Sequence, residues 1–151
     1  MKYRVIAIGK LKRGFYRDGC AHFLTRLAPY APVDVLELKE GRGPPEQVKQ
    51  QESEALLKAA SGHLIALDEG GAQHRSEAYA ARVSALETGG RGQISLLIGG
   101  ANGLSDALKG AVNELWSLST LTLPHDLARL VLLEQLYRLE TIRAGHPYHR
   151  E

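Results

Sequence analysis

The chain has 151 residues, a formal net charge of +2 and one cysteine, Cys20, so we expect a single domain spanning residues 1–151 without an intrachain disulfide. No secretory leader opens the sequence, and we therefore expect a cytoplasmic location. No apolar run approaches the roughly 18 residues of a membrane span, which argues against a membrane protein.

Positive charge is concentrated at the start of the chain. Residues 1–17 contain no acidic side chain. They hold six basic ones, Lys2, Arg4, Lys10, Lys12, Arg13 and Arg17. Such a cluster attracts phosphate groups. A solvated basic face, balanced by the acidic residues of segment 37–54, explains the same charges equally well. Charge alone does not decide between these interpretations.

Five short apolar runs predict the strands in chain order. They are YRVIAIG (3–9), VDVLELK (33–39), HLIALD (63–68), QISLLIGG (93–100) and SLSTLTL (117–123). The other segments predict helices at 14–28, 46–60, 76–88, 105–116 and 126–144. This alternation predicts an α/β fold, a mostly parallel sheet with helices on both faces. The consecutive apolar residues of SLLI predict a strand that is covered on both sides.

Ser76 and Ser105 each stand at the start of a predicted helix. Serine commonly caps a helix, because its hydroxyl accepts a hydrogen bond from a main-chain N–H group of the first turn. We therefore predict that both serines are N-caps.

Three strand ends carry unusual residues: EGG after HLIALD, GGANGLS after QISLLI, and PHD after SLSTLTL. Ligands of open parallel sheets bind beyond the carboxyl ends of the strands. The glycine turn from Gly99 lets the main chain approach a ligand closely. It is not a dinucleotide loop, because Ala101 and Leu104 stand where glycines are required, and no phosphate loop is present. Glycine turns before helices are also ordinary in this fold class.

The segment LSTLTLPHD alternates apolar and small hydroxyl residues until Pro124, which stops strand pairing. Its free main-chain groups would suit the edge of a flat heterocycle, and its leucines would supply apolar walls. An edge strand with polar residues facing outward explains the same pattern.

The sequence gives little support for a metal site or for covalent catalysis. His146 and His149 form H-x-x-H and His125 offers a third ligand, but no cysteine pair or carboxylate–histidine cluster accompanies them, so we expect no metal. No G-x-S-x-G elbow is present. The remaining option is chemistry carried by an activated cofactor that the protein positions.

Three blocks are similar, in the same order, to the RlmH family of ribosomal large-subunit pseudouridine N3-methyltransferases, which belong to the SPOUT class. The blocks are LLIGGANGLS, WSLSTLTLPHDLARLVLLEQLYR and GHPYHRE. The resemblance implies a SPOUT fold with a C-terminal trefoil knot and S-adenosyl-L-methionine as cofactor. It also implies methylation of N3 of a pseudouridine in helix 69 of 23S rRNA. The net charge of only +2 favours recognition of the assembled ribosome over tight binding to free RNA.

The resemblance assigns residues to two parts of a site. The expected cofactor contacts are Leu67, Gly99, Leu118, Ser119, Thr120, Leu121, Thr122 and Leu123. The family also implies a homodimer in which the tail, residues 146–151, docks near the partner's pocket. Tyr148, His149 and Arg150 would then be catalytic, with His149 as proton acceptor, Arg150 as anion contact, and Tyr148 stacking on the base or anchoring the tail.

Two other functions remain open at this point. One is a catalytically silent, dimeric RNA-binding module. The other is an enzyme of small nucleotides that transfers no methyl group, which the absence of both phosphate loops disfavours.

Overall fold

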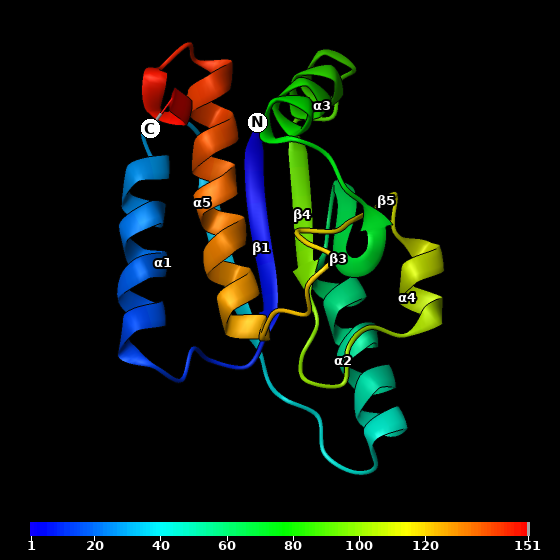
Figure 1. Ribbon diagram of the computed structural model, residues 1–151. Coiled ribbons are helices and arrows are strands. Elements are labelled where there is room, and N and C mark those ends of the chain that lie inside the picture. The colour runs from blue at the N-terminus through cyan, green and yellow to red at the C-terminus, as the bar shows by residue number, and fades with distance from the viewer. Residues whose placement is uncertain (151) are drawn as a thin grey trace.

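A computed structural model describes residues 1–150, in which strands and helices alternate along the chain (Figure 1). The strands are β1 (Lys2–Ile8), β2 (Val33–Leu38), β3 (His63–Ala72), β4 (Gln93–Ile98) and β5 (Glu114–Trp116). The helices are α1 (Gly14–Leu27), α2 (Pro45–Ala59), α3 (Ser76–Thr88), α4 (Asp106–Ala111) and α5 (His125–Arg143), followed by the 3-10 helix η1 (Pro147–Arg150).

The strands form one sheet in the order β2-β1-β4-β3-β5, and every neighbouring pair is parallel. This confirms the predicted parallel sheet. The central strand β4 is buried on both faces, because Ser95, Leu96 and Leu97 have no exposed surface. The prediction that SLLI is covered on both sides is therefore confirmed.

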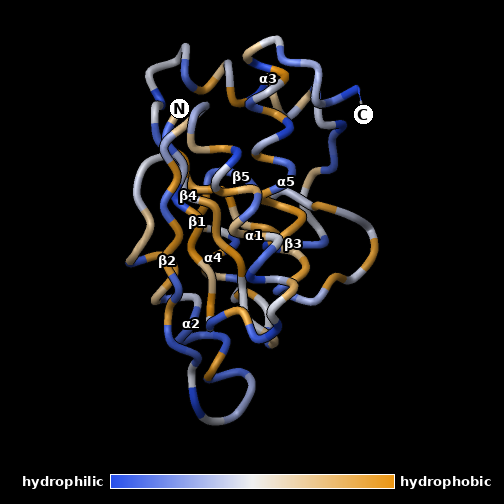
Figure 2. The backbone as a smooth tube through the Cα atoms, turned by 90° about the vertical axis from the view of Figure 1, so that its left-hand side faces the viewer, coloured by the Kyte–Doolittle hydropathy of each residue, from blue (hydrophilic) through white to orange (hydrophobic). Residues whose placement is uncertain are grey.

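Helices cover both faces of the sheet, as predicted (Figure 1). Side chains of successive strand residues point to opposite faces, so Leu96 packs in the core beneath α1, α3 and α5. Its neighbour Leu97 packs in a smaller core that includes Leu56 of α2 and Leu108 of α4. Figure 2 shows the hydrophobic residues concentrated along the strands in the middle of the molecule.

The predicted fifth strand at 117–123 was wrong. The actual strand, β5, ends at Trp116, and α4 ends at Ala111 instead of continuing to residue 116. The Ser117 hydroxyl donates to the carbonyl of Ser119 at 2.8 Å, and the Leu121 N–H donates to the Ser119 hydroxyl at 3.0 Å. These local bonds compete with strand pairing, so residues 117–124 form a loop.

Ser105 caps α4 as predicted, because its hydroxyl accepts from the Leu108 N–H at 3.1 Å. The prediction for Ser76 was wrong. Arg75 is the N-cap of α3, and Ser76 is the first helical residue. The Ser76 hydroxyl instead donates to the Gln135 side chain of α5 at 2.6 Å, so it links two helices.

Within residues 1–150, no helix combines the length and apolar character needed to cross a membrane. The same residues hold no cluster of three or more His, Cys, Asp or Glu side chains arranged for a metal ion. His125 starts α5, whereas His146 and His149 lie beyond its other end. Cys20 is buried, and burial raises the pKa of its thiol, which disfavours a reactive role.

Candidate functional site

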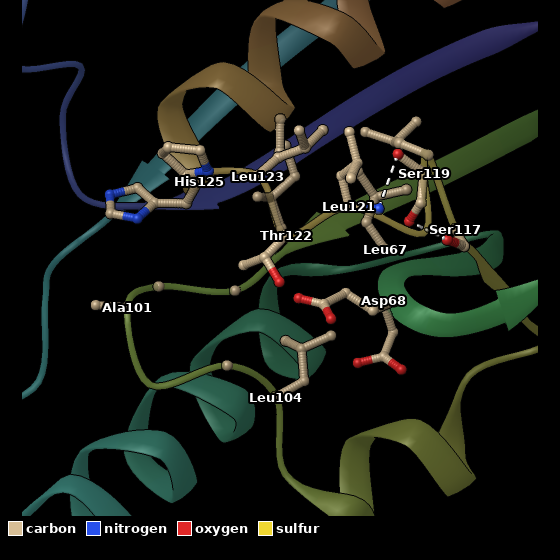
Figure 3. A pocket seen from close by; sticks show the side chains of 18 residues that line it. Leu67, Asp68, Ala101, Leu104, Ser117, Ser119, Leu121, Thr122, Leu123 and His125 are labelled. Atoms are coloured by element: carbon tan, nitrogen blue, oxygen red, sulfur yellow. Dashed lines mark hydrogen bonds between the residues drawn. The ribbon is translucent and has the colours of Figure 1, made fainter.

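A pocket of about 570 Å³ lies at the carboxyl ends of the strands (Figure 3). Most of its lining residues come from three separate segments: 67–69 in β3, 98–104 from the end of β4 onward, and 117–125 from the end of β5 to the start of α5. The first segment begins where β3 stops pairing with β4, after Ala66. The three strand ends that are unusual in sequence therefore meet in one cavity.

Seven of the eight predicted cofactor residues line this pocket: Leu67, Gly99, Leu118, Ser119, Leu121, Thr122 and Leu123. Thr120 is exposed and is not among the lining residues. The structure thus brings together residues that are up to 56 positions apart, from Leu67 to Leu123. Their role in binding a cofactor stays a prediction.

The glycine turn after β4 has tight packing that a side chain would disturb. A Cβ atom at Gly99 would lie 2.9 Å from Leu104 Cδ2 and 3.1 Å from the carbonyl carbon of Gly103. Gly103 has a φ of +77°, which favours glycine, and its N–H donates to the Gly100 carbonyl at 3.0 Å. The turn therefore holds bare main chain at the pocket wall.

The loop 117–124 forms the facing wall and belongs to no strand. Leu121 is 69% exposed although it lines the pocket. An exposed leucine beside a cavity offers apolar surface to a ligand. The loop thus combines apolar side chains, which the sequence pattern predicted as pocket walls, with main chain that lies outside the sheet, where a strand had been predicted.

Some pocket residues were not assigned individually from the sequence: Asp68, Glu69, Ser117 and His125 are among them. The Asp68 carboxylate lies 3.2 Å from Lys109 Nζ and also accepts from the Gly70 N–H at 3.0 Å. Asp68 directly follows an apolar run, and this position was the sequence signal that could have identified it. The motifs EGG and PHD already marked the strand ends to which the other residues belong.

The predicted catalytic tail does not reach the pocket of its own chain. Tyr148 packs against α5, where its hydroxyl donates to the Glu134 carboxylate at 2.9 Å and its ring lies 4.5 Å from that of Tyr137. His149 and Arg150 belong to the adjacent η1. The 19 residues of α5 span roughly 28 Å. His125 and Ala128 at the start of this helix line the pocket, whereas η1 follows its other end (Figure 1). Glu151 lies outside the described residues.

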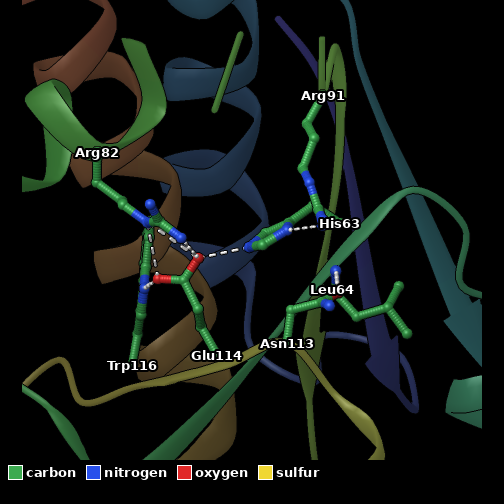
Figure 4. A network of polar contacts seen from close by, with 7 residues as sticks. All are labelled: His63, Leu64, Arg82, Arg91, Asn113, Glu114 and Trp116. Carbon is green, nitrogen blue, oxygen red and sulfur yellow. Dashed lines mark hydrogen bonds and ion pairs between the residues drawn. The ribbon is translucent and has the colours of Figure 1, made fainter. Parts of the chain in front are cut away.

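The amino ends of the strands carry a different kind of polar cluster (Figure 4). Arg91 donates to His63 Nδ1 at 2.9 Å, so Nε2 of His63 carries the proton and donates to Glu114. Glu114 also accepts from Arg82 at 3.0 Å and from the Trp116 indole at 3.1 Å. Burial opposes ionisation of Glu114, but these hydrogen bonds outweigh it and keep the pKa of the carboxyl below its ordinary value.

A second cluster of hydrogen-bonded polar side chains lies where the start of β1 meets the end of α5. The Tyr3 hydroxyl donates to the buried Glu140 carboxylate at 2.5 Å, and Arg143 donates to the same carboxylate at 2.6 Å. Burial, and next the charge of Glu140, raise the pKa of Tyr3 well above its ordinary value. The phenol therefore remains a hydrogen-bond donor at neutral pH.

Residues 1–149 match the family model described as "Predicted SPOUT methyltransferase". The chain belongs to this SPOUT methyltransferase family. The resemblance to a methyltransferase family is thus confirmed, and the parallel α/β sheet agrees with it. The trefoil knot stays a prediction.

Proteins named "Ribosomal RNA large subunit methyltransferase H" are among the relatives of this SPOUT chain. The one from Deinococcus radiodurans is 44% identical over 151 residues, with 99% of each chain covered. The one from Bacillus cytotoxicus is 42% identical over 159 residues, covering 99% of this chain and 100% of that one. The SpoU methyltransferase AviRb from Streptomyces viridochromogenes aligns with a TM-score of 0.48 and 15% identity over 96% of this chain and 61% of its own length.

Proposed function

We propose that the protein is an S-adenosyl-L-methionine-dependent methyltransferase acting on N3 of a pseudouridine in helix 69 of 23S rRNA, within assembled ribosomes of the cytoplasm. The convergence of the three predicted cofactor segments in one pocket of a SPOUT methyltransferase carries this proposal. The names of the relatives support ribosomal RNA as the substrate. In this proposal residues 1–151 act as one methyltransferase domain whose C-terminal part forms a trefoil knot.

The pocket residues suit this cofactor. Leu67, Leu121 and Leu123 offer apolar walls to a nucleoside, and the loop main chain offers hydrogen bonds to the edge of an adenine ring. The bare turn at Gly99 leaves room for close approach of the ligand. When bound, S-adenosyl-L-methionine supplies an electrophilic methyl group on its sulfonium sulfur. The protein then has to orient the acceptor and remove its proton, without a metal ion.

The position of the tail supports a homodimer in which one protomer completes the pocket of the other. Tyr148 is anchored on α5 by Glu134 and Tyr137, which favours the anchoring role for Tyr148 over stacking on the base. His149 and Arg150 would then enter the partner's pocket. There His149 accepts the N3 proton, and Arg150 stabilises the negative charge on the base carbonyls or binds a phosphate.

The basic N-terminal segment divides into two groups. Lys10, Lys12, Arg13 and Arg17 follow β1 at the end of the sheet where the pocket lies. Arg4 lies within β1 and pairs with Asp34 at 3.1 Å. We therefore assign phosphate contacts with the RNA to residues 10–17. Ribosome binding should weaken with rising salt.

The first experiment measures transfer of labelled methyl from S-adenosyl-L-methionine to ribosomes that lack the modification, followed by mapping of the altered base. We expect one methyl group on N3 of a pseudouridine in helix 69. Binding to ribosomes without methyl transfer would instead favour the catalytically silent RNA-binding module. Methylation at another base would overturn the assigned target.

The second experiment tests the shared site. One variant carries Gly99→Val, which should displace the turn against Leu104 and Gly103 and so disrupt the pocket, and the other lacks residues 146–151. Each alone should be inactive, whereas mixed dimers contain one intact pocket with one intact tail, so an equal mixture should regain about a quarter of wild-type activity. No recovery in verified mixed dimers would show that the tail does not act on the partner's pocket.

A further inference from the structure

A second cavity of about 270 Å³ adjoins the pocket. The two cavities share Gly100, Ala101 and His125 as lining residues, and Figure 3 shows Ala101 and His125 at the same end of the pocket. None of the predicted cofactor residues lines the second cavity. A cavity of about 150 Å³ holds a benzene molecule, so this one has room for a pyrimidine ring.

Glu52 of α2 is the most unusual residue of this cavity. Its side chain is buried, with 4% of the residue exposed. One carboxylate oxygen, Oε2, accepts from the Gly41 N–H at 2.9 Å. The other, Oε1, is buried and has no hydrogen-bond partner among residues 1–150. An unpaired buried carboxylate oxygen destabilises the folded protein. A hydrogen-bond donor from a ligand would therefore be favourable at this atom.

The described residues around Glu52 supply no hydrogen-bond donor to that oxygen. A Cβ atom at Gly100 would lie 2.8 Å from Glu52 Oε1, so the oxygen lies next to the turn that separates the cavity from the pocket. The lysine of the cavity, Lys12, lies near a different acid, with Nζ 3.8 Å from Glu40 Oε1. The absence of a side chain at Gly100 therefore lets an unpaired acceptor lie against this turn, at the border of the two cavities.

We propose that this cavity binds the acceptor base and that Glu52 Oε1 accepts a ring N–H group from it. The inference rests on the proposed function, because it places the base beside the methyl donor. Pseudouridine has two ring N–H groups, at N1 and N3, whereas uridine has a C–H group in the position of the pseudouridine N1. With N3 directed at the pocket, N1–H is the donor that remains for Glu52.

Glu52 thereby determines specificity for pseudouridine over uridine. A site with a buried hydrogen-bonding group discriminates strongly against an analogue that lacks the matching group, because the buried group is then left unpaired. A uridine in this cavity would present carbon to Glu52 Oε1. That oxygen would then remain without a donor, as it is among the described residues.

The test compares wild type with Glu52→Gln on two kinds of ribosome, one with pseudouridine and one with uridine at the target position. The amide keeps the acceptor for Gly41 but presents an NH₂ donor to the base. We expect pseudouridine methylation to fall by roughly tenfold or more and the preference for pseudouridine to fall toward one. The Kd for S-adenosyl-L-methionine should change less than about twofold, and Tm should stay equal or rise, because an unpaired buried charge is removed.

Glu54→Gln is the matched control, because Glu54 lies on the same helix, is exposed, and pairs with Gln50 at 3.3 Å. It should match wild type in all four measurements. An unchanged preference in Glu52→Gln would overturn the inference, as would a lower Tm with equal losses on both ribosomes. Loss of cofactor binding would place Glu52 in the cofactor site and also overturn it. A wild type that transfers no methyl group would overturn the proposed function, and the inference with it.

Discussion

The two ends of the sheet differ in how completely their buried acidic side chains are paired. At the amino ends of the strands, His63 and Glu114 bind each other and two arginines (Figure 4). At the carboxyl ends, Glu52 Oε1 and Asp126 Oδ1 are buried without a hydrogen-bond partner among residues 1–150. Polar groups that satisfy one another stabilise the fold, whereas an unsatisfied buried group suggests a missing donor, so we expect a ligand at the carboxyl ends.

The main chain shows the same contrast. At the amino end of β3, Gly62 packs directly against β4, because a Cβ atom there would lie 2.5 Å from the Gln93 carbonyl oxygen. At the carboxyl end, the turn 99–103 and the loop 117–124 leave the sheet and enclose a cavity of about 570 Å³. Substitutions at the two ends should therefore separate stability from ligand binding.

The largest effect is expected from Arg143→Ala at the amino end. This change leaves the buried Glu140 carboxylate without its cationic partner, so the free energy of unfolding should fall by about 3 kcal/mol. Urea denaturation measures it. Arg75→Ala, which removes an exposed pair with Glu77, should stay within about 0.5 kcal/mol of wild type. Equal losses in both variants would contradict the contrast between the two ends.

Gly99→Ala should weaken the binding of S-adenosyl-L-methionine more than it lowers the stability of the fold. The new Cβ atom would press on Leu104 and Gly103, displacing the turn, so the Kd for S-adenosyl-L-methionine should rise by about tenfold, or about 1.4 kcal/mol. Calorimetric titration gives the value. Gly92→Ala is the control, because a Cβ atom there meets nothing within 4 Å. Unaltered binding by Gly99→Ala would remove the turn from the cofactor site.

Glu114→Gln tests the cluster at the amino ends through the pH dependence of the free energy of unfolding. Because the folded-state pKa of Glu114 is lowered, its charge stabilises the fold above the unfolded pKa near about 4.3, and this contribution is lost as the pH falls through the folded pKa. The variant should lose about 1 kcal/mol at pH 7, allowing for solvent screening of a half-buried group. Its deficit relative to wild type should shrink below about pH 4. A deficit constant with pH would exclude the carboxylate charge as the cause.

Leu121→Ala is expected to have the smallest effect. The side chain is 69% exposed, so stability should change by less than about 0.5 kcal/mol. Binding of S-adenosyl-L-methionine should weaken by about threefold, because a ligand in the pocket covers this leucine. Phe15→Ala removes another exposed apolar side chain, 62% exposed on α1, and should leave cofactor binding unchanged. If both variants bound equally well, Leu121 would not contact the cofactor.

Periodicity predicted most of the fold, because four strands are short runs rich in apolar residues and four of the helices have 13 residues or more. It was wrong at the fifth strand. The hydroxyls of Ser117 and Ser119 form hydrogen bonds to nearby main chain, so this segment is a loop although its apolar and polar residues alternate as in a strand. The actual β5 has only three residues, ELW, and is too short to show a period.

The pocket was predicted in part, because glycine and proline mark the strand ends in sequence. Glu52 was not predicted, since it belongs to an amphipathic helix rich in polar residues. Its burial arises from contact with a turn 48 positions later, at Gly100. Such long-range packing leaves no local signal in one sequence.

The edge strand β5 pairs only with β3 and leads directly into the loop that walls the pocket. A molecule bound between that loop and the turn after β4 would therefore hold this edge strand against β3 and β4. By mass action, a ligand present at 100 times its Kd adds about 2.7 kcal/mol to the free energy of unfolding. The gain should appear first as slower amide hydrogen exchange in β5, before any change at β1 or β4.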